Sequence, residues 1–133
     1  MDAEKRSIAE FCLNASHDGS LGFPEIVGTL IEAGFESYCV DFRRKSQSYY
    51  LPDGDSITLS LPSLSYLIAP TFNAAEMGRL VRWAQDNPPD YRYFAFCEKA
   101  AAAGCAGYMV SFLGWRVVYF GRTAEIHVEH FPG

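Results

Sequence analysis

Helical spacing of apolar residues marks the start of each half of the chain. Ile8, Phe11 and Cys12 would share one face of a first helix, and His17 falls in the polar segment after it, which we expect to be a loop. The remaining helix ends follow from local signals. Pro24 suits a first helical position, Asn73 and Asp90 suit N-caps, and Gly34 and Gly104 suit helix stops. The pattern predicts four helices, over residues 3–14, 24–34, 73–86 and 90–104.

Alternation of apolar and polar residues follows each pair of helices. In the first half, Tyr38, Val40 and Phe42 lie on one face while Cys39 and Asp41 lie on the other. A period of two is typical of strands with one buried face. It predicts six strands, over residues 35–42, 47–51, 57–61, 108–112, 116–120 and 124–131. Each half therefore has the order α-α-β-β-β.

The two halves also match residue by residue. Tyr38 and Phe42 recur as Tyr108 and Phe112, at a constant offset of 70. Matching aromatic residues at matching spacings indicate an internal duplication. We predict an α+β fold in which antiparallel sheet, as one sheet or two, is covered by helices. Residues 1–133 would form a single pseudo-symmetric domain, with repeats over about 3–61 and 73–131 and a linker over about 62–72.

The match continues into the third strand of each half if the second half has one residue fewer in the preceding turn. With that gap, Ile57 and Leu59 align with Ile126 and Val128. Apolar residues of a one-faced strand pack against the covering layer. We therefore expect Ile126 and Val128 to face the helices.

Glu125, His127 and Glu129 would then share the opposite face of the last strand. Two carboxylates and an imidazole in one row are candidate ligands for a divalent metal, and they also suit a general base with its orienting partner. The alternative is a solvated polar face, which antiparallel strands commonly have. Apart from such a metal we expect no cofactor.

Ser111 is a third catalytic candidate beside His127 and Glu129. If all outward positions share one surface, Ser111 and Asp41 lie on the same side as His127, which allows a Ser-His-Asp arrangement. No Gly-x-Ser-x-Gly elbow accompanies it.

The aromatic rows of the strands have two interpretations. They form the core between the halves, or they line a ligand groove at the pseudo-twofold axis, where tyrosine hydroxyls orient the ligand. For such a site the binding candidates are Tyr119, Arg116, Glu125 and His127. Trp115 and Arg116 follow a tight turn, and we expect them to be exposed and available to a protein partner.

The composition and net charge of the chain limit the classes of binding partner that we expect. The chain has 133 residues, a hydrophobic share of 49% and a net charge of −5. The net charge is acidic, and Lys and Arg form only one cluster, Arg43-Arg44-Lys45, where a turn is expected. This balance favours neither nucleic acid nor an anionic membrane as partner. Four cysteines without CxxC spacing, together with an acidic N-terminus, predict reduced thiols in a cytoplasmic protein.

Three segments together resemble a known family. They are residues 107–112, 116–121 and 125–132, with Val40-Asp41-Phe42-Arg43-Arg44 upstream. This pattern is similar to the YbcV-like family of small bacterial and prophage-borne proteins, and the similarity covers nearly the whole chain. The resemblance implies a domain of unknown function, sometimes labelled a phage envelope protein, and it brings no established catalytic residues.

The leading functional hypothesis is a small binding or regulatory module. It would hold a small molecule or a protein on the open sheet face or in the groove between the halves, and homodimerisation is left open. The first alternative is an enzyme that uses His127 with Glu125 and Glu129 as base or metal ligands. The second is a phage-related accessory or structural protein.

Overall fold

The computed structural model describes residues 1–61 and 67–132, so residues 62–66 of the predicted linker lie outside the described residues. Within those ranges the chain forms four helices and six strands. In chain order these are α1 (Ala3–Asp18), α2 (Phe23–Glu32), β1 (Ser37–Asp41), β2 (Ser46–Tyr50), β3 (Ser56–Ser60), α3 (Ala74–Asp86), α4 (Tyr93–Ala102), β4 (Cys105–Ser111), β5 (Arg116–Gly121) and β6 (Ile126–His130).

The strands form one continuous antiparallel sheet. Their order is β3-β2-β1-β4-β5-β6, so the three strands of each half are joined at the centre by the pairing of β1 with β4. The predicted α+β fold is therefore confirmed, and the strands of the two halves merge in a single sheet. Strands β3 and β6 form its two edges.

Local signals explain the helix limits. The carboxylate of Asp2 accepts a hydrogen bond from the backbone N–H of Lys5, and the Asn73 side chain accepts one from Glu76, so both are N-caps. Helix α1 extends to Asp18, which places His17 in the helix; the expectation of a loop there was wrong. None of the helices in the described residues has both the length and the apolar character needed to cross a bilayer.

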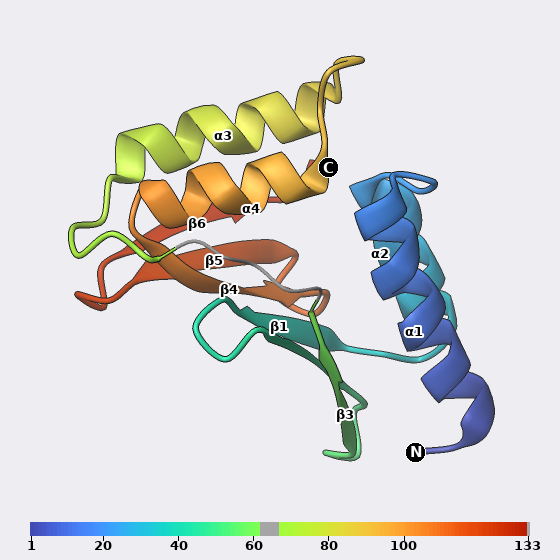
Figure 1. Cartoon of the computed structure of the whole chain (residues 1–133). Coiled ribbons are helices and arrows are strands. Elements are labelled where there is room, and N and C mark those ends of the chain that lie inside the picture. The colour runs from blue at the N-terminus through green and yellow to red at the C-terminus, as the bar shows by residue number, and fades with distance from the viewer. Residues whose placement is uncertain (62–66, 133) are drawn as a thin grey trace.

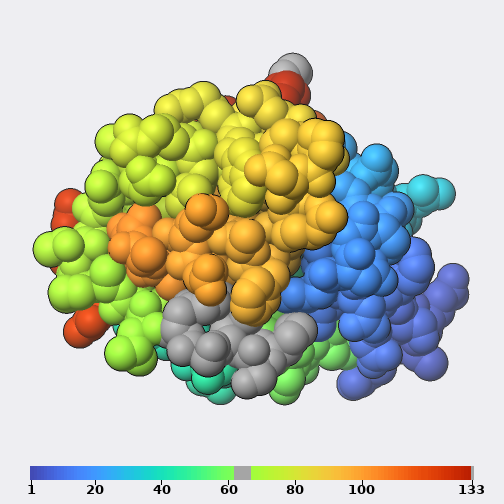
Figure 2. Space-filling model, turned by 45° about the horizontal axis from the view of Figure 1, so that its top comes forward, coloured from blue at the N-terminus to red at the C-terminus, as the bar shows by residue number. Residues whose placement is uncertain are grey.

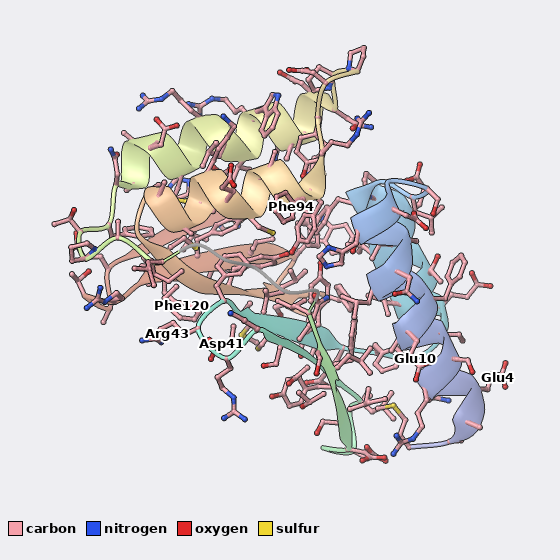
Figure 3. The ribbon with its side chains drawn as sticks, in the orientation of Figure 1. Glu4, Glu10, Asp41, Arg43, Phe94 and Phe120 are labelled. Carbon is pink, nitrogen blue, oxygen red and sulfur yellow. The ribbon has the colours of Figure 1, made fainter. Side chains whose placement is uncertain are left out.

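The helices cover one face of the sheet and leave the other open. Side chains alternate between a buried and a more exposed face along β1, β2 and β5, and the buried face is the one under the helices (Figure 1). Helix α4 contacts α1, so the two helix pairs meet over the same face of the sheet (Figure 2). Asp41 and Arg43, at the β1–β2 turn, lie on the side of the sheet away from α3 and α4 (Figure 3).

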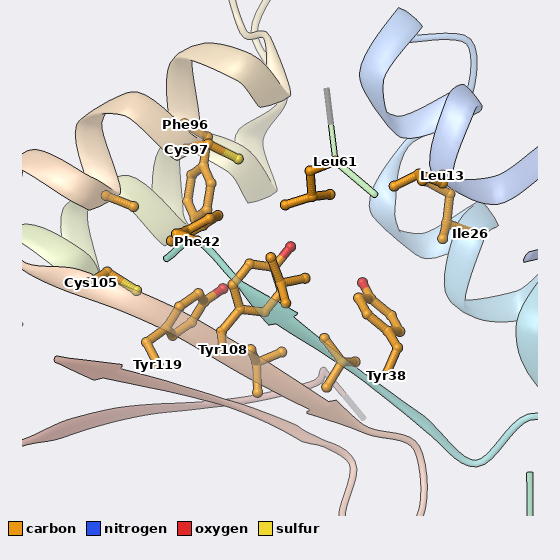
Figure 4. Close-up of a cluster of buried hydrophobic side chains, with 14 of the residues drawn as sticks. Leu13, Ile26, Tyr38, Phe42, Leu61, Phe96, Cys97, Cys105, Tyr108 and Tyr119 are labelled. Atoms are coloured by element: carbon orange, nitrogen blue, oxygen red, sulfur yellow. The ribbon is translucent and has the colours of Figure 1, made fainter. Parts of the chain in front are cut away.

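Aromatic side chains fill the space between the sheet and the helices. Tyr38, Tyr108 and Tyr119 point from the sheet toward the helix layer, where Phe96 and Leu13 meet them (Figure 4). All three tyrosines are buried. The prediction that the aromatic rows form the core is confirmed.

Equivalent hydrogen bonds recur at a spacing of 70 residues. The N–H of Phe42 donates to the carbonyl of Ala106, and the N–H of Phe112 donates to that of Glu36. The two β-turns that lead into the third strands also match. Leu51 N–H donates to Asp55 and Gly121 N–H to Glu125, with N···O distances of 2.9 Å in both turns. The halves are thus arranged with pseudo-twofold symmetry, while their origin by duplication stays a prediction.

The predicted gap in the second of these turns was wrong. Tyr49 pairs with Ile57 in the first half, and its counterpart Tyr119 pairs with His127 in the second. The offset of 70 therefore continues to the edge strands, and His127 is the counterpart of Ile57. A shift of one residue turns every side chain of a strand to the other face, which decides where the candidate residues lie.

Gly34 and Gly104 provide a matched test of the two helix-to-strand connections. Their φ angles are 99° and 91°. A Cβ atom on Gly34 would lie 3.8 Å from Cε of Lys5, whereas one on Gly104 would lie 1.9 Å from the carbonyl oxygen of Thr71. We expect Gly34→Ala to lower the free energy of unfolding by about 1 kcal/mol through left-handed strain. Gly104→Ala adds a backbone clash, and we expect it to lower that free energy by about 3 kcal/mol or more.

Urea unfolding of the two variants measures this difference. Equal losses of stability in the two variants would contradict the close approach of the Thr71 backbone to Gly104.

Candidate functional site

His127 and Glu129 face the helix layer, which corrects their predicted orientation. His127 pairs with Tyr119 and Glu129 pairs with Val117, and both of those β5 residues are buried under the helices. Directly opposed residues of antiparallel strands share a face. Ile126 and Val128 therefore lie on the open face, where we had expected the charged row.

The two side chains form a pair beside α3. Nε2 of His127 lies 2.7 Å from Oε1 of Glu129, and the side chains are 24% and 26% exposed. Cε1 of His127 lies 3.7 Å from where a Cβ of Gly78 would be, and a guanidinium nitrogen of Arg82 lies 3.5 Å from the same point. The missing side chain of Gly78 leaves room for both groups.

Glu125 does not join this pair. It precedes β6, and its carboxylate accepts a hydrogen bond of 2.8 Å from the hydroxyl of Thr123. Within residues 1–61 and 67–132, no three His, Cys, Asp or Glu side chains form a potential metal site. The described residues therefore bring together two of the three candidate metal ligands.

Tyr119 adjoins the pair from the core side. Its ring centroid lies 6.4 Å from that of His127. Burial raises the pKa of the Tyr119 hydroxyl well above its ordinary value, and the negative charge of Glu129 adds to this shift. Tyr119 is therefore neutral at physiological pH and can only donate or accept a hydrogen bond there.

Ser111 and Asp41 lie on the open face and stabilise turns. The Ser111 hydroxyl accepts a hydrogen bond from Gly114 N–H, and the Asp41 carboxylate accepts from the N–H groups of Arg43 and Arg44. Because His127 faces the helices, the predicted Ser-His-Asp arrangement is wrong. Arg116 is also on the open face, paired with Ser111, and so is separated from Tyr119 and His127.

Trp115 is exposed, as the sequence predicted. Its exposed fraction is 42%, while its ring packs against Phe131 and its indole N–H donates to the carbonyl of Pro132. Arg116 is exposed as well, and its guanidinium donates to the carbonyl of Gly114.

The open face carries an apolar patch that sequence reasoning missed. Cross-strand pairs place Met109 beside Val118 and Val118 beside Val128, and place Phe120 beside Ile126. Met109 and Ile126 are 42% and 57% exposed. The missed signal was that β4, β5 and β6 all carry apolar residues at the positions of one face. We call Met109, Val118, Phe120, Ile126 and Val128 the open-face patch.

The other half of the open face is polar. Its surface residues on β2 and β3 are hydroxyl-bearing, and the hydroxyls of Ser48 and Thr58 lie 2.8 Å apart. A hollow of about 280 Å³ separates this polar half from the open-face patch. It is lined by Glu36, Ser37, Cys39, Tyr50, Leu51, Pro52, Gly54 and Met109.

A second hollow, of about 500 Å³, lies between α3 and α4. Its walls include Trp83 and Lys99, and the Lys99 ammonium group lies 5.8 Å from the centre of the Trp83 ring. Arg79 and Glu76 on its rim form an ion pair of 2.6 Å. Much of the charge around this hollow is therefore engaged with neighbouring side chains.

Neither the models of known protein families nor the curated proteins give a match to this chain. The resemblance to the YbcV-like family stays a prediction.

The edge strands β3 and β6 carry different inward residues at equivalent positions. Exchanging these residues between the two strands tests whether the His127–Glu129 pair is needed for stability. We expect the double variant His127→Ile, Glu129→Leu, which copies Ile57 and Leu59, to have unchanged stability or to gain up to about 1 kcal/mol, because replacing a partly buried ion pair by apolar groups is often neutral or favourable. The reverse exchange, Ile57→His with Leu59→Glu, should cost about 3 kcal/mol because Ile57 is buried.

Thermal and urea unfolding measure both variants. A large loss of stability in the first variant would show that the pair is itself structural, and that its position is not free for another role.

Cys39 provides a chemical probe of the open face. The other three cysteines are buried, whereas Cys39 is partly exposed beside the hollow. Burial raises the pKa of its thiol, so little thiolate forms at neutral pH. We expect iodoacetamide to modify Cys39 alone in the native protein, more slowly than a free thiol and faster as pH rises. Peptide mass spectrometry identifies the modified residue; labelling of Cys12 or Cys97 in the folded protein would contradict the described packing.

Proposed function

We propose that the protein is a binding module that holds a protein partner on its open sheet face. The observation that carries this proposal is the open-face patch. An apolar sheet face opposite a complete helix layer is normally covered by another layer, and exposed contiguous apolar surface commonly marks an interaction site.

Charge is placed at the margin of this surface. The open-face patch itself holds no charged side chain. Asp41 lies on β1 beside Gly107 of β4, and Arg116 of β5 lies beside Ser111 at the other end of β4. This arrangement, an apolar centre with a polar rim, is typical of protein interfaces. Glu36 at the rim of the hollow favours a partner with a basic group beside its apolar contact.

The dimensions favour a protein over a small molecule. Small-molecule sites are clefts of roughly 300–1,000 Å³ that enclose most of the ligand. The hollow beside the open-face patch, at about 280 Å³, lies at the lower limit of that range, and the hollow of about 500 Å³ between α3 and α4 lies away from the open face. The hollow beside the patch suits a single protruding side chain of a partner whose remaining surface lies over the patch.

Catalysis by the His127–Glu129 pair is the second candidate function. It is favoured by the 2.7 Å contact, which would let Glu129 orient the imidazole, and by the partial exposure of both groups. Calorimetric titration with zinc ion tests the metal version of this function. Binding that is lost in His127→Ala supports it, and no binding to the wild-type chain contradicts it. The phage-related role stays a prediction that rests on the resemblance alone.

The partner proposal is tested by crosslinking from two opposite sides of the molecule. A photo-reactive amino acid replaces Met109 on the open face, and in a matched control it replaces Glu98, an exposed residue of α4. We expect one protein to be crosslinked in native cells from position 109 and not from position 98. With that protein purified, Met109→Asp should weaken binding at least about tenfold because it places a charge in the apolar contact.

Glu98→Ala should leave the affinity unchanged. Equal crosslinking from both positions, or full affinity in Met109→Asp, would contradict the proposal.

A further inference from the structure

The free edge of β6 has unpaired backbone groups in a regular order. Phe131 N–H donates to Trp115 and Gly121 N–H donates to Glu125, so the odd-numbered residues of this segment bond to β5. The N–H and C=O groups of Ile126, Val128 and His130 must then point away from β5. Because β6 is the last strand of the sheet, these groups have no strand partner among the described residues.

We propose that a second copy of this chain pairs with this edge, β6 against β6 in antiparallel orientation, about a twofold axis at Val128. In that register Val128 lies opposite Val128 of the second copy, and Ile126 lies opposite His130. Ile126, Val128 and His130, whose backbone groups point outward, then each form hydrogen bonds with a residue of the second copy whose backbone groups also point outward. The two sheets become one continuous sheet with both helix layers on the same side.

The side chains select this register. His127 lies opposite Glu129 of the second copy, and Glu129 lies opposite its His127, at the non-hydrogen-bonded positions where side chains approach most closely. Moving the axis to residue 127 or 129 would place His127 opposite itself or Glu129 opposite itself. Inward charges usually prevent an edge strand from pairing. Here a hydrogen-bonding imidazole alternates with a carboxylate, so each carboxylate of one copy would lie opposite an imidazole of the other and not opposite a second carboxylate.

The two copies therefore build one site that neither has alone. Each chain supplies a His127–Glu129 pair with a 2.7 Å contact, and the twofold axis brings the two pairs together as a quartet. The guanidinium of Arg82 and the ring of His127 both approach Gly78, at 3.5 and 3.7 Å from where its Cβ would lie, so the quartet would form on the side of α3 that carries Arg82.

Helix α3 packs against β6, and Gly78 faces His127. The exposed residues Ala74 and Ala75 lie four and three positions before Gly78 on the same side of the helix, and Arg82 lies four positions after it. A second copy paired with β6 would meet this side of α3. Since Ile126 and Val128 belong to the open-face patch, edge pairing would also join the patches of the two copies. The inference itself does not depend on the open face binding another protein.

Sedimentation equilibrium over a dilution series measures the association of the full chain. We expect a species of twice 14.8 kDa that dissociates on dilution. Val128→Pro removes an outward N–H without touching the bonds to β5, and loses two symmetry-related hydrogen bonds. It should weaken the dimer about a hundredfold. Thr58→Pro is the matched control, because Thr58 occupies the same position on the β3 edge.

Charge variants test the register. Glu129→Lys places a positive charge opposite His127 and should weaken association at least about tenfold. The double variant His127→Glu, Glu129→Lys places a carboxylate opposite each lysine in the proposed register and should restore association. Circular dichroism establishes that each variant is folded.

Amide exchange tests the same inference without substitution. In concentrated wild-type protein, the amides of Ile126, Val128 and His130 should exchange slowly and become fast on dilution, while those of Thr58 and Ser60 stay fast. A wild-type chain that is monomeric throughout, an unaffected Val128→Pro dimer, or dissociation by Thr58→Pro would overturn the proposal. Met109→Asp, which lies away from the edge, should leave the dimer intact, so loss of the open-face partner and loss of the dimer are separate results.

Discussion

The antiparallel pairing of β1 with β4 is the contact from which the arrangement of the two halves follows. It joins two three-stranded units edge to edge, and the reciprocal hydrogen bonds of Phe42 with Ala106 and of Phe112 with Glu36 extend it at both ends. Each half alone would have a small core, and its first strand, β1 or β4, would be an edge strand with one unpaired side. Joined, they bury Tyr38 and Tyr108 against each other, with ring centroids 6.5 Å apart, beneath the helix layer.

The same pairing creates the exposed surfaces that we connect with function. Once the helices occupy one face, the other face must be polar or be covered. In the first half it is largely polar, with Ser48 and Thr58 bonded to each other. In the second half it carries the open-face patch. The open faces of the two halves therefore differ in polarity, although the central inward residues Tyr38 and Tyr108 are the same.

The two edge strands, β3 and β6, differ on the face that is turned toward the helices. Ile57 is buried in the core, whereas its counterpart His127 is partly exposed and bonded to Glu129. A polar pair at a core-facing position of an edge strand is more costly than two apolar residues unless it gains partners. A second copy would supply such partners in the proposed register.

The sequence by itself determined the elements and their order, because periodicity, caps and glycine stops are local signals. It left two interpretations of the aromatic rows, and the burial of Tyr38, Tyr108 and Tyr119 decided for the core. It also placed Trp115 at the surface. It did not determine which face of β6 is inward, because Ile126 and Val128 have the apolar character expected of a core. The tertiary structure decided that question through the turn over residues 121–124. That turn has the same length and hydrogen bonds as its counterpart in the first half, and it therefore fixed the register of β6 against β5. From that register follow the inward His127 and Glu129, their separation from Ser111 and Arg116, and the apolar patch on the open face.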